Sequence, residues 1–323
     1  MRYKVSVIVP VYNAAEYIER CVRSLMSQTL REIEYIFIDD CSKDGGMAVL
    51  EKTLADYPER IGDVRILRHE ANRGVARSRV EGLDIARGDY VAYCDSDDWV
   101  DTRMYEKMYQ ALVSEGADLC LSDFLFVNHD GMVRAGLGFE KGLGKEDIVR
   151  QCCLRYPFTT VWSLMATRDL FNSSGARLSA GITFAEDLFM AVCLHTSASK
   201  IVCVREPLYY YNMLNPSSIV HTLSERKFMG EIDCCVRLAD RLKEQGIYKT
   251  YRKEMEWRML KCCAWLIFQN RFDEFRKYVP GVSLSMLTVP GNFCDRKAKV
   301  MILLTALHLD FICRWDNKRH GRF

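Results

Sequence analysis

Two clusters of acidic residues carry the clearest chemical signal in this chain of 323 residues. They are Asp39-Asp40 and Asp95-Ser96-Asp97-Asp98. In the second cluster, Asp95 and Asp97 stand on alternate positions, so a turn after an extended segment can direct both carboxylates at one ligand. Carboxylate oxygens suit Mg²⁺ or Mn²⁺, and either ion would neutralise a departing diphosphate. The alternative is an ordinary strand-end turn whose aspartate caps the next helix.

The elements around both clusters alternate between buried strands and amphipathic helices. Near-continuous apolar runs predict buried strands over residues 5–9 and 35–38, and two further strands are expected over 64–67 and 90–93. Apolar residues at helical spacing predict helices between them, over residues 14–29, 45–57 and 76–86. The pattern predicts an α/β fold with a mostly parallel sheet flanked by helices. Such sheets bind ligands at the carboxyl ends of their strands, where both acidic clusters stand.

The pattern changes in the second half of the chain. A helix over 102–114 and a strand over 118–124 come first, and the glycine-rich segment 128–144 indicates an irregular or hairpin insertion. Further helices and short strands are expected over 145–155, 186–196, 200–204 and 208–212. Residues 224–278 have a mainly helical pattern. We therefore predict a catalytic domain over 1–222 and a helical C-terminal region over 223–323.

Three further residues at the predicted sheet edge could contact a nucleotide. Tyr12 follows the first strand and could stack on a base, unless it is a core tyrosine. Asp40 could accept a hydrogen bond from a base N–H, unless it belongs to an ordinary turn. The segment 72–77 opens a helix, whose N-terminus attracts phosphate, and Arg77 would add a fork-shaped donor there. Its alternative is a solvated basic first turn.

The composition excludes several classes of protein. Lys and Arg number 45 against 43 Asp and Glu, a net charge of +2, so the overall charge does not indicate a nucleic-acid partner. The 14 cysteines form no C-x-x-C pair, so a zinc ribbon is not expected. The N-terminal sequence contains no secretory signal, which predicts a cytoplasmic protein whose cysteines act as small buried hydrophobes.

Three ordered segments between residues 4 and 125 resemble glycosyltransferase family 2, which has the nucleotide-sugar-binding GT-A fold. They are VSVIVPVYNAAEYIERCVRSLMSQTL, IDDCSKDGG and NRGVARSRVEGLDIARGDYVAYCDSDDW. Cys41 departs from the pattern, because the family usually has Gly or another small residue there. The resemblance implies an inverting transferase that uses a nucleotide-diphosphate sugar, most often a UDP-sugar, with Mn²⁺ or Mg²⁺ as cofactor.

The resemblance also implies roles for individual residues in these segments. Pro10, Val11 and Tyr12 would line the base pocket. Asp40 would recognise the base, with Asp39 supporting it. Asn72 and Arg77 would lie near the base and the diphosphate. Asp95 and Ser96 would contact the ribose. Asp97 would bind the metal, and Asp98 would hold the loop or contact the sugar.

Inversion by single displacement needs a carboxylate on the side opposite the leaving diphosphate. The segment 181–188, GITFAEDL, resembles the family's E-D motif, which implies Asp187 as the base and Glu186 as its support or an acceptor contact. The alternative is a helix N-terminus with two favourable acids.

Four downstream residues are candidates for donor or acceptor contacts. Residues 207–218 resemble a family segment that often has Y-Y-x-R followed by serine, but Asn212 stands in place of the arginine. This resemblance suggests Tyr211 and Ser217 as contacts. His221 could contact phosphate or metal, and Trp162 could stack on a sugar face or belong to the core.

The acceptor would be a hydroxyl of a glycan or a lipid-linked saccharide. Residues 300–313 are mostly apolar with basic flanks, too short to span a bilayer, and form either a buried helix or a helix at a membrane surface.

Two other functions share the fold. A nucleotidyltransferase would need a Gly-rich, basic loop after the first strand, but residues 12–16 contain an acid instead. A non-catalytic nucleotide or sugar binder would not need Asp95, Asp97 and Asp187, which are all present.

Overall fold

The computed structural model describes residues 2–135, 144–154, 159–216, 224–282, 286–288 and 295–319. The chain forms two compact units. The first comprises Met1–Val149 and Pro157–Thr222, and the second comprises Arg150–Tyr156 and Leu223–Phe323. The segment Arg150–Tyr156 thus lies in the helical unit, although it precedes most of that unit by some 70 residues.

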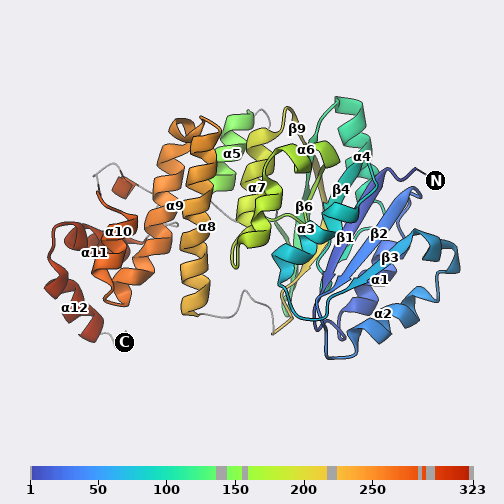
Figure 1. Ribbon diagram of the computed structural model, residues 1–323, viewed down its shortest axis with the longest axis horizontal. Helices are drawn as coiled ribbons and strands as arrows, with labels where there is room; N and C mark the ends of the chain where they lie inside the picture. Colours follow the sequence, from blue (N-terminus) through green and yellow to red (C-terminus); the bar gives the residue numbers. More distant parts are fainter. Residues whose placement is uncertain are drawn as a thin grey trace. The chain divides into compact units, whose positions relative to one another are not determined.

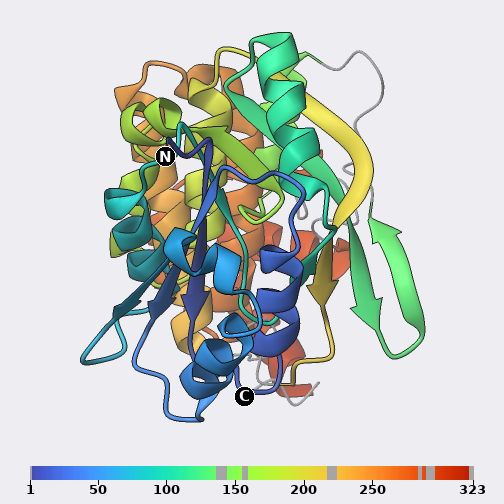
Figure 2. The same cartoon turned by 90° about the vertical axis from the view of Figure 1, so that its right-hand side faces the viewer.

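The first unit is built on a sheet whose first half is parallel, as Figure 2 shows from the direction of its strand arrows. The strands lie in the order β3-β2-β1-β4, and their bounds are Val5–Val11 (β1), Ile33–Asp39 (β2), Val64–Arg68 (β3) and Tyr90–Tyr93 (β4). Every residue of β1 and β2 is buried, as their apolar runs predict. Val11 pairs with Asp39 and Ile8 with Tyr93, so both acidic clusters follow strands at the same edge of the sheet.

Helices cover both faces of this sheet (Figure 1), and four of them were expected from the spacing of apolar residues. They are α1 (Ile18–Met26), α2 (Gly46–Leu54), α3 (Val75–Ile85) and α4 (Met104–Glu115), with a 3₁₀ turn over Pro58–Asp63. Helix α3 packs closely on β1 at Gly82. A Cβ atom there would lie 2.4 Å from Ile8 Cγ2, so only glycine allows this approach.

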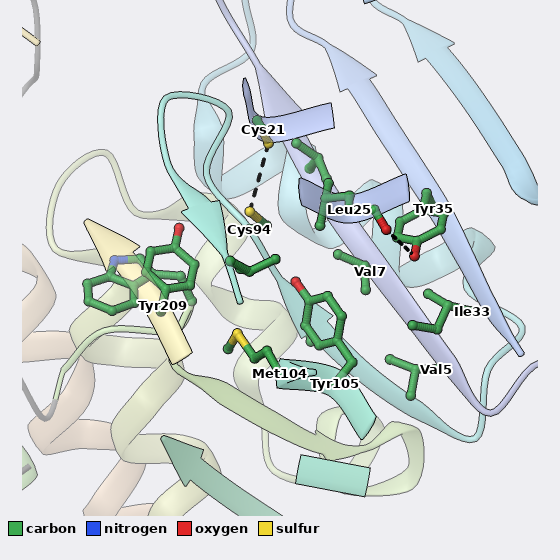
Figure 3. Close-up of a cluster of buried hydrophobic side chains, with 14 of the residues drawn as sticks. Val5, Val7, Cys21, Leu25, Ile33, Tyr35, Cys94, Met104, Tyr105 and Tyr209 are labelled. Atoms are coloured by element: carbon green, nitrogen blue, oxygen red, sulfur yellow. Dashed lines mark hydrogen bonds between the residues drawn. The ribbon is translucent and has the colours of Figure 1, made fainter. Parts of the chain in front are cut away.

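Apolar side chains from the sheet and from α1 and α4 form one core, part of which is drawn in Figure 3. Val5 and Val7 extend from β1 towards Leu25 and Tyr105. The Tyr35 hydroxyl donates a hydrogen bond to the carbonyl of Leu25 at 2.6 Å, so this buried phenol is satisfied. Of the described cysteines, Cys41 and Cys203 are partly exposed and the others are buried, as expected for small hydrophobes.

The second half of the sheet contains antiparallel strands that the sequence analysis did not predict. The further strands are β5 (Trp99–Val100), β6 (Leu119–Asn128), β7 (Gly131–Ala135), β8 (Leu164–Thr167) and β9 (Ile201–Asn212). Strand β8 joins β4 to β6, and β5 and β8 were missed. The strands predicted over 200–204 and 208–212 are the single strand β9, whose pairing with β6 shifts register around Asp123. The β6–β7 hairpin confirms part of the insertion over 128–144.

The described helices of this half of the first unit are α5 (Lys145–Leu154), α6 (Arg168–Ser173) and α7 (Glu186–Ser197), with a 3₁₀ turn over Ala176–Gly181. Of these, α5 and α7 were predicted, whereas α6 was not. Helix α5 begins in the first unit and ends in the second. Helix α7 begins at Glu186, so the E-D motif occupies its first turn.

The second unit is helical, as predicted for residues 224–278. Its elements are α8 (Glu225–Glu244), α9 (Tyr248–Phe268), α10 (Phe272–Tyr278), a 3₁₀ turn over Met286–Thr288, α11 (Arg296–Ala306) and α12 (Asp310–Arg319). Helices α8 and α9 lie side by side (Figure 1). Ser224 and Asp295 cap α8 and α11 through hydrogen bonds from Lys227 N and Ala298 N.

The apolar segment 300–313 is divided between two helices, whereas one continuous segment was expected. Helix α11 ends at Ala306 and α12 begins at Asp310. His308 between them has φ +58°, a left-handed conformation that turns the chain. Within the ranges that the structure describes, no helix is long and apolar enough to cross a membrane.

Candidate active site

The loops that follow β1 and β2 are joined by hydrogen bonds at the carboxyl edge of the sheet. Asn13 Oδ1 accepts the N–H of Lys43 at 2.8 Å, and Asp39 Oδ1 accepts the N–H of Ser42 at 2.9 Å. Cys41 has φ +66°, in the left-handed region that favours glycine. The loop therefore keeps its left-handed turn in spite of the cysteine.

Asp40 fixes the loop that opens α3. It is 3% exposed, and its two carboxylate oxygens accept the N–H groups of Arg73 at 2.7 Å and Gly74 at 2.8 Å. His69 Nδ1 lies 2.8 Å from the same carboxylate. Asp40 therefore positions the loop 69–74, and its predicted contact with a base stays a prediction.

The other predicted donor contacts lie around these loops. Tyr12 is 50% exposed at the end of β1, so its ring is available for stacking, while Pro10 and Val11 are buried in the strand. Asn72 is exposed in the loop before α3. Arg77 lies on the outer face of α3, where its Nε donates to Glu81 at 2.5 Å.

Arg79, which the sequence analysis did not single out, joins the second acidic cluster to the E-D motif. Its side chain is 3% exposed. Its guanidinium donates to Asp95 at 2.8 Å and to Glu186 at 3.0 Å, and it also pairs with Asp187. One cation thus gathers carboxylates from β4 and α7, which are distant in the sequence.

Helical spacing could have identified Arg79. It stands three positions after Ala76 and four before Leu83, two buried residues of α3. An arginine on the buried face of a helix needs anionic partners, because an unpaired charge is costly there. Arg77, on the outer face of α3, is not on the buried face of the helix.

Burial, together with two neighbouring carboxylates, favours proton uptake at Asp187. Partial burial raises the pKa of Asp187 well above its ordinary value; Arg79 opposes the rise, and Glu186 and Asp95 add to it. A carboxylate whose pKa is raised towards neutrality accepts a proton more readily, as a general base must. Like Arg79, the position of Asp187 in the first turn of α7 opposes the rise, because a helix N-terminus favours the charged form.

Asp98 connects the second cluster to β9. It is 1% exposed and accepts hydrogen bonds from the Tyr209 hydroxyl at 2.6 Å and from Asn212 N at 2.7 Å. The Asp95 N–H donates to the same hydroxyl at 3.1 Å. Asp98 therefore holds the loop after β4 against β9, which was one of its two predicted roles.

Asp97 has the environment of a cation ligand. Burial, followed by the negative charge of Asp95, raises its pKa, so a cation nearby would relieve an unfavourable charge. Asn215 Nδ2 donates to Asp97 Oδ2 at 2.8 Å, and Ser96 is buried beside it. In the described part of the chain, no three His, Cys, Asp or Glu side chains converge on a metal position. Carboxylate oxygens such as those of Asp95 and Asp97 are nevertheless the ligand type that suits an ion whose other ligands are phosphates and water.

The candidates for acceptor contacts have different environments. Trp162 is 2% exposed, and its ring stacks on Tyr209 at 4.3 Å and on Tyr211 at 5.4 Å between centroids. It belongs to the core, so its alternative role as a sugar-stacking surface does not fit this structure. Tyr211 is partly exposed. Ser217 and His221 lie outside the described residues.

Comparisons with known proteins show similarity to glycosyltransferases in sequence and in fold. Residues 6–158 match the model of glycosyl transferase family 2. The chain is 31% identical over 222 residues to the uncharacterized glycosyltransferase EpsJ of Bacillus subtilis, a match that spans 67% of this chain and 62% of EpsJ.

Two solved structures have a similar fold. The structure of S. aureus TarS 1-349 in complex with UDP-GlcNAc has a TM-score of 0.65 at 18% identity, covering 98% of this chain and 89% of the other. The mannosyltransferase PcManGT of Pyrobaculum calidifontis, in complex with GDP-Man and Mn²⁺, has a TM-score of 0.53 at 14% identity, covering 98% and 87%.

Proposed function

The chain belongs to glycosyltransferase family 2 through residues 6–158, and we propose that it transfers a sugar from a UDP-sugar to an acceptor hydroxyl with inversion. The acceptor belongs to a glycan or a lipid-linked saccharide. The observation that carries this proposal is the Arg79 cluster, because it brings Asp187 into one site with Asp95 at the nucleotide-binding edge of the sheet.

The proposed donor site lies over the loops after β1 and β2. The exposed ring of Tyr12 supports base stacking, and the fixed loop 69–74 presents the N-terminus of α3 to the nucleotide. The UDP-GlcNAc complex of the structurally similar TarS supports a uridine nucleotide. We therefore assign the base to the side of Tyr12 and Asp40, and the ribose to Asp95 and Ser96.

Asp97, together with Asp95, would hold Mn²⁺ or Mg²⁺. The raised pKa of Asp97 supports this assignment, as does the Mn²⁺ complex of the mannosyltransferase with a similar fold. When bound, such an ion neutralises negative charge on the leaving diphosphate.

In the proposed reaction Asp187 accepts the proton of the acceptor hydroxyl. The hydroxyl oxygen then forms a bond to the anomeric carbon from the side opposite the diphosphate. The bond between that carbon and the diphosphate oxygen breaks, and its electron pair leaves with the diphosphate. Arg79 orients the carboxylate of Asp187, and Glu186 supports it from the same turn of α7.

Calorimetry with UDP, GDP, CDP and ADP, each with Mn²⁺ or with EDTA, tests the donor site without knowledge of the acceptor. We expect UDP to bind most tightly, and only with the metal. Asp97→Asn should weaken this binding about tenfold or more, because it removes a charged ligand. Asp89→Asn is the matched control, since Asp89 precedes β4 at the opposite end of that strand and pairs with Arg2.

Each result decides one part of the proposal. Preference for GDP would keep the mechanism and change the donor. Equal UDP binding with Mn²⁺ and with EDTA would remove the metal from the proposed mechanism. If none of the four nucleotides bound, the result would contradict a transferase site and favour a non-catalytic protein of the same fold.

A further inference from the structure

Helix α12 presents aromatic and basic side chains outward on one face. Phe311 is 67% exposed and Trp315 is 62% exposed, although both are large apolar side chains. The exposed residues stand at spacings of three and four, which places them on a single stripe of the helix. This stripe, called here the aromatic-basic face, consists of Phe311, Arg314, Trp315, Lys318 and Arg319.

The opposite side of α12 is anchored in the helical unit. Cys313 and Asn317 are completely buried. The Asn317 side-chain amide donates to the carbonyl of Ile267 and to Asn270 Oδ1, both at 3.0 Å. The orientation of the helix is therefore fixed by its buried side, and the exposure of the two aromatic rings follows from that packing.

The acidic side chains of α12 are held in ion pairs, whereas its exposed charged side chains are basic. Its two carboxylates are held in ion pairs within the helical unit, Asp310 with Arg276 at 2.9 Å and Asp316 with Lys297 at 2.6 Å. The exposed charged residues of the helix are all cationic, and the Arg319 guanidinium lies 5.4 Å from the Trp315 ring centroid. The aromatic-basic face is thus positive as well as apolar.

The end of α11 extends the exposed apolar surface. Leu307, directly after α11, is 60% exposed, and Val300 within that helix is 56% exposed. Their apolar neighbours Met301 and Ile302 are buried in the core of the unit, so α11 divides its apolar residues between the core and the surface. Figure 1 shows the two helices in succession at the end of the chain.

We propose that the aromatic-basic face, with Leu307, docks on an anionic membrane surface. Aromatic side chains settle at the boundary between headgroups and acyl chains, while Lys and Arg beside them attract anionic lipids. The short helix would lie in the surface plane and would not cross the bilayer. Charge complementarity favours lipid over a second copy, because a symmetric contact would bring the cations of two such faces together.

Docking would place the transferase where lipid-linked acceptors are found, and this consequence alone rests on the proposed function. The lipid contact itself depends only on α11 and α12. Failure of transfer and failure of membrane binding are therefore separate results.

Co-sedimentation of the full chain with vesicles tests the proposal. One set contains equal parts of phosphatidylglycerol and phosphatidylcholine, and the other contains phosphatidylcholine alone. We expect the chain to partition onto the anionic vesicles about tenfold more strongly, and less so at high salt. Phe311→Ser with Trp315→Ser should lower this partition about tenfold, because both apolar anchors are lost.

A second variant and a control keep the result interpretable. Arg314→Gln with Lys318→Gln and Arg319→Gln alters only exposed side chains and should abolish the preference for anionic vesicles. Ile61→Ser with Val113→Ser removes two half-exposed apolar residues from the first unit, and should bind vesicles like the parent chain. Circular dichroism of every variant reports folding.

Three outcomes would overturn the proposal. They are failure of the parent chain to bind anionic vesicles, equal binding to both vesicle types, and unchanged binding by the aromatic and the charge variants. A fourth outcome, a dimer of the parent chain in light scattering that the aromatic variant abolishes, would assign the face to self-association.

Discussion

The two acidic clusters stand at the same edge of the sheet, but different groups hold them. Asp39 and Asp40 accept mainly backbone N–H groups, from Ser42, Arg73 and Gly74. The carboxylates of Asp95, Asp97 and Asp98 accept hydrogen bonds chiefly from side chains of distant elements: Arg79, Asn215 and Tyr209. The first cluster therefore fixes the conformation of the loops beside it, whereas the second cluster pairs with side chains from several distant parts of the chain. The predictions below test this difference.

The largest effect is expected from Arg79→Met. It leaves the carboxylates of Asp95, Glu186 and Asp187 without their shared cation, so we expect turnover of the donor sugar to fall about 1000-fold. Arg79→Lys keeps a positive charge and should retain more activity. The comparison variant is Arg77→Met, expected to lose about threefold or less, because Arg77 is half-exposed and Arg73 also pairs with Glu81.

Initial rates of sugar release measure these effects, and thermal melting curves identify variants that fail to fold. An equal loss in the Arg77 and Arg79 variants would contradict the assignment of Arg79 as the residue that joins the site.

Asp98→Ala should have the largest effect on stability. It leaves the buried Tyr209 hydroxyl and the Asn212 N–H without an acceptor, a cost of about 3 kcal/mol in the free energy of unfolding. Urea unfolding measures it. Asp56→Ala serves as control, since its surface pair with Arg23 should contribute at most about 0.5 kcal/mol. Similar values for both variants would show that Asp98 does not hold β9.

Asp40→Asn should have a smaller effect, confined to the loop before α3. An amide has one acceptor atom, so one of the Arg73 and Gly74 N–H groups loses its partner, at a cost of about 1 kcal/mol. Hydrogen exchange of these two amides should become faster, while β1 stays protected. Unchanged exchange would mean that the loop is fixed by other contacts.

The smallest effect is expected in the pH dependence of turnover. Because the pKa of Asp187 is raised, the base becomes protonated as the pH falls through a range where ordinary aspartates remain ionised. Activity should therefore decline on the acid side at a higher pH than an ordinary aspartate would give. Glu186→Gln removes a neighbouring negative charge, so it should move this decline to lower pH. A shift in the opposite direction would contradict the described arrangement.

The parallel half of the sheet could be predicted because β1 and β2 are buried on both faces and carry continuous apolar runs, although β3 at the edge is partly exposed. Strand β8 could not, since its four residues, Leu164–Thr167, have no turn signal on either side and depend on pairing with β4 and β6. The break between α11 and α12 was also missed, because the apolar pattern continues through Leu307 and Leu309.

The candidate site was predicted in part. Short motifs singled out Asp95, Asp97 and Asp187, and Arg77 was proposed because it lies near the helix N-terminus. Arg79, which joins Asp95 to Asp187, was not considered. The difference between the two arginines depends on which face of α3 packs against the sheet, and on the partners that α7 brings from far along the chain.

One paired measurement tests the central claim that Asp187 is the base of an inverting transferase. UDP affinity by calorimetry and turnover of the donor sugar are compared between the parent chain and Asp187→Asn. We predict UDP affinity within about threefold of the parent, because Arg79 keeps its pairs with Asp95 and Glu186. Turnover should be lower by at least about 1000-fold, because the amide cannot accept the proton. Near-normal turnover with a genuine acceptor would contradict the account and move the base to another residue.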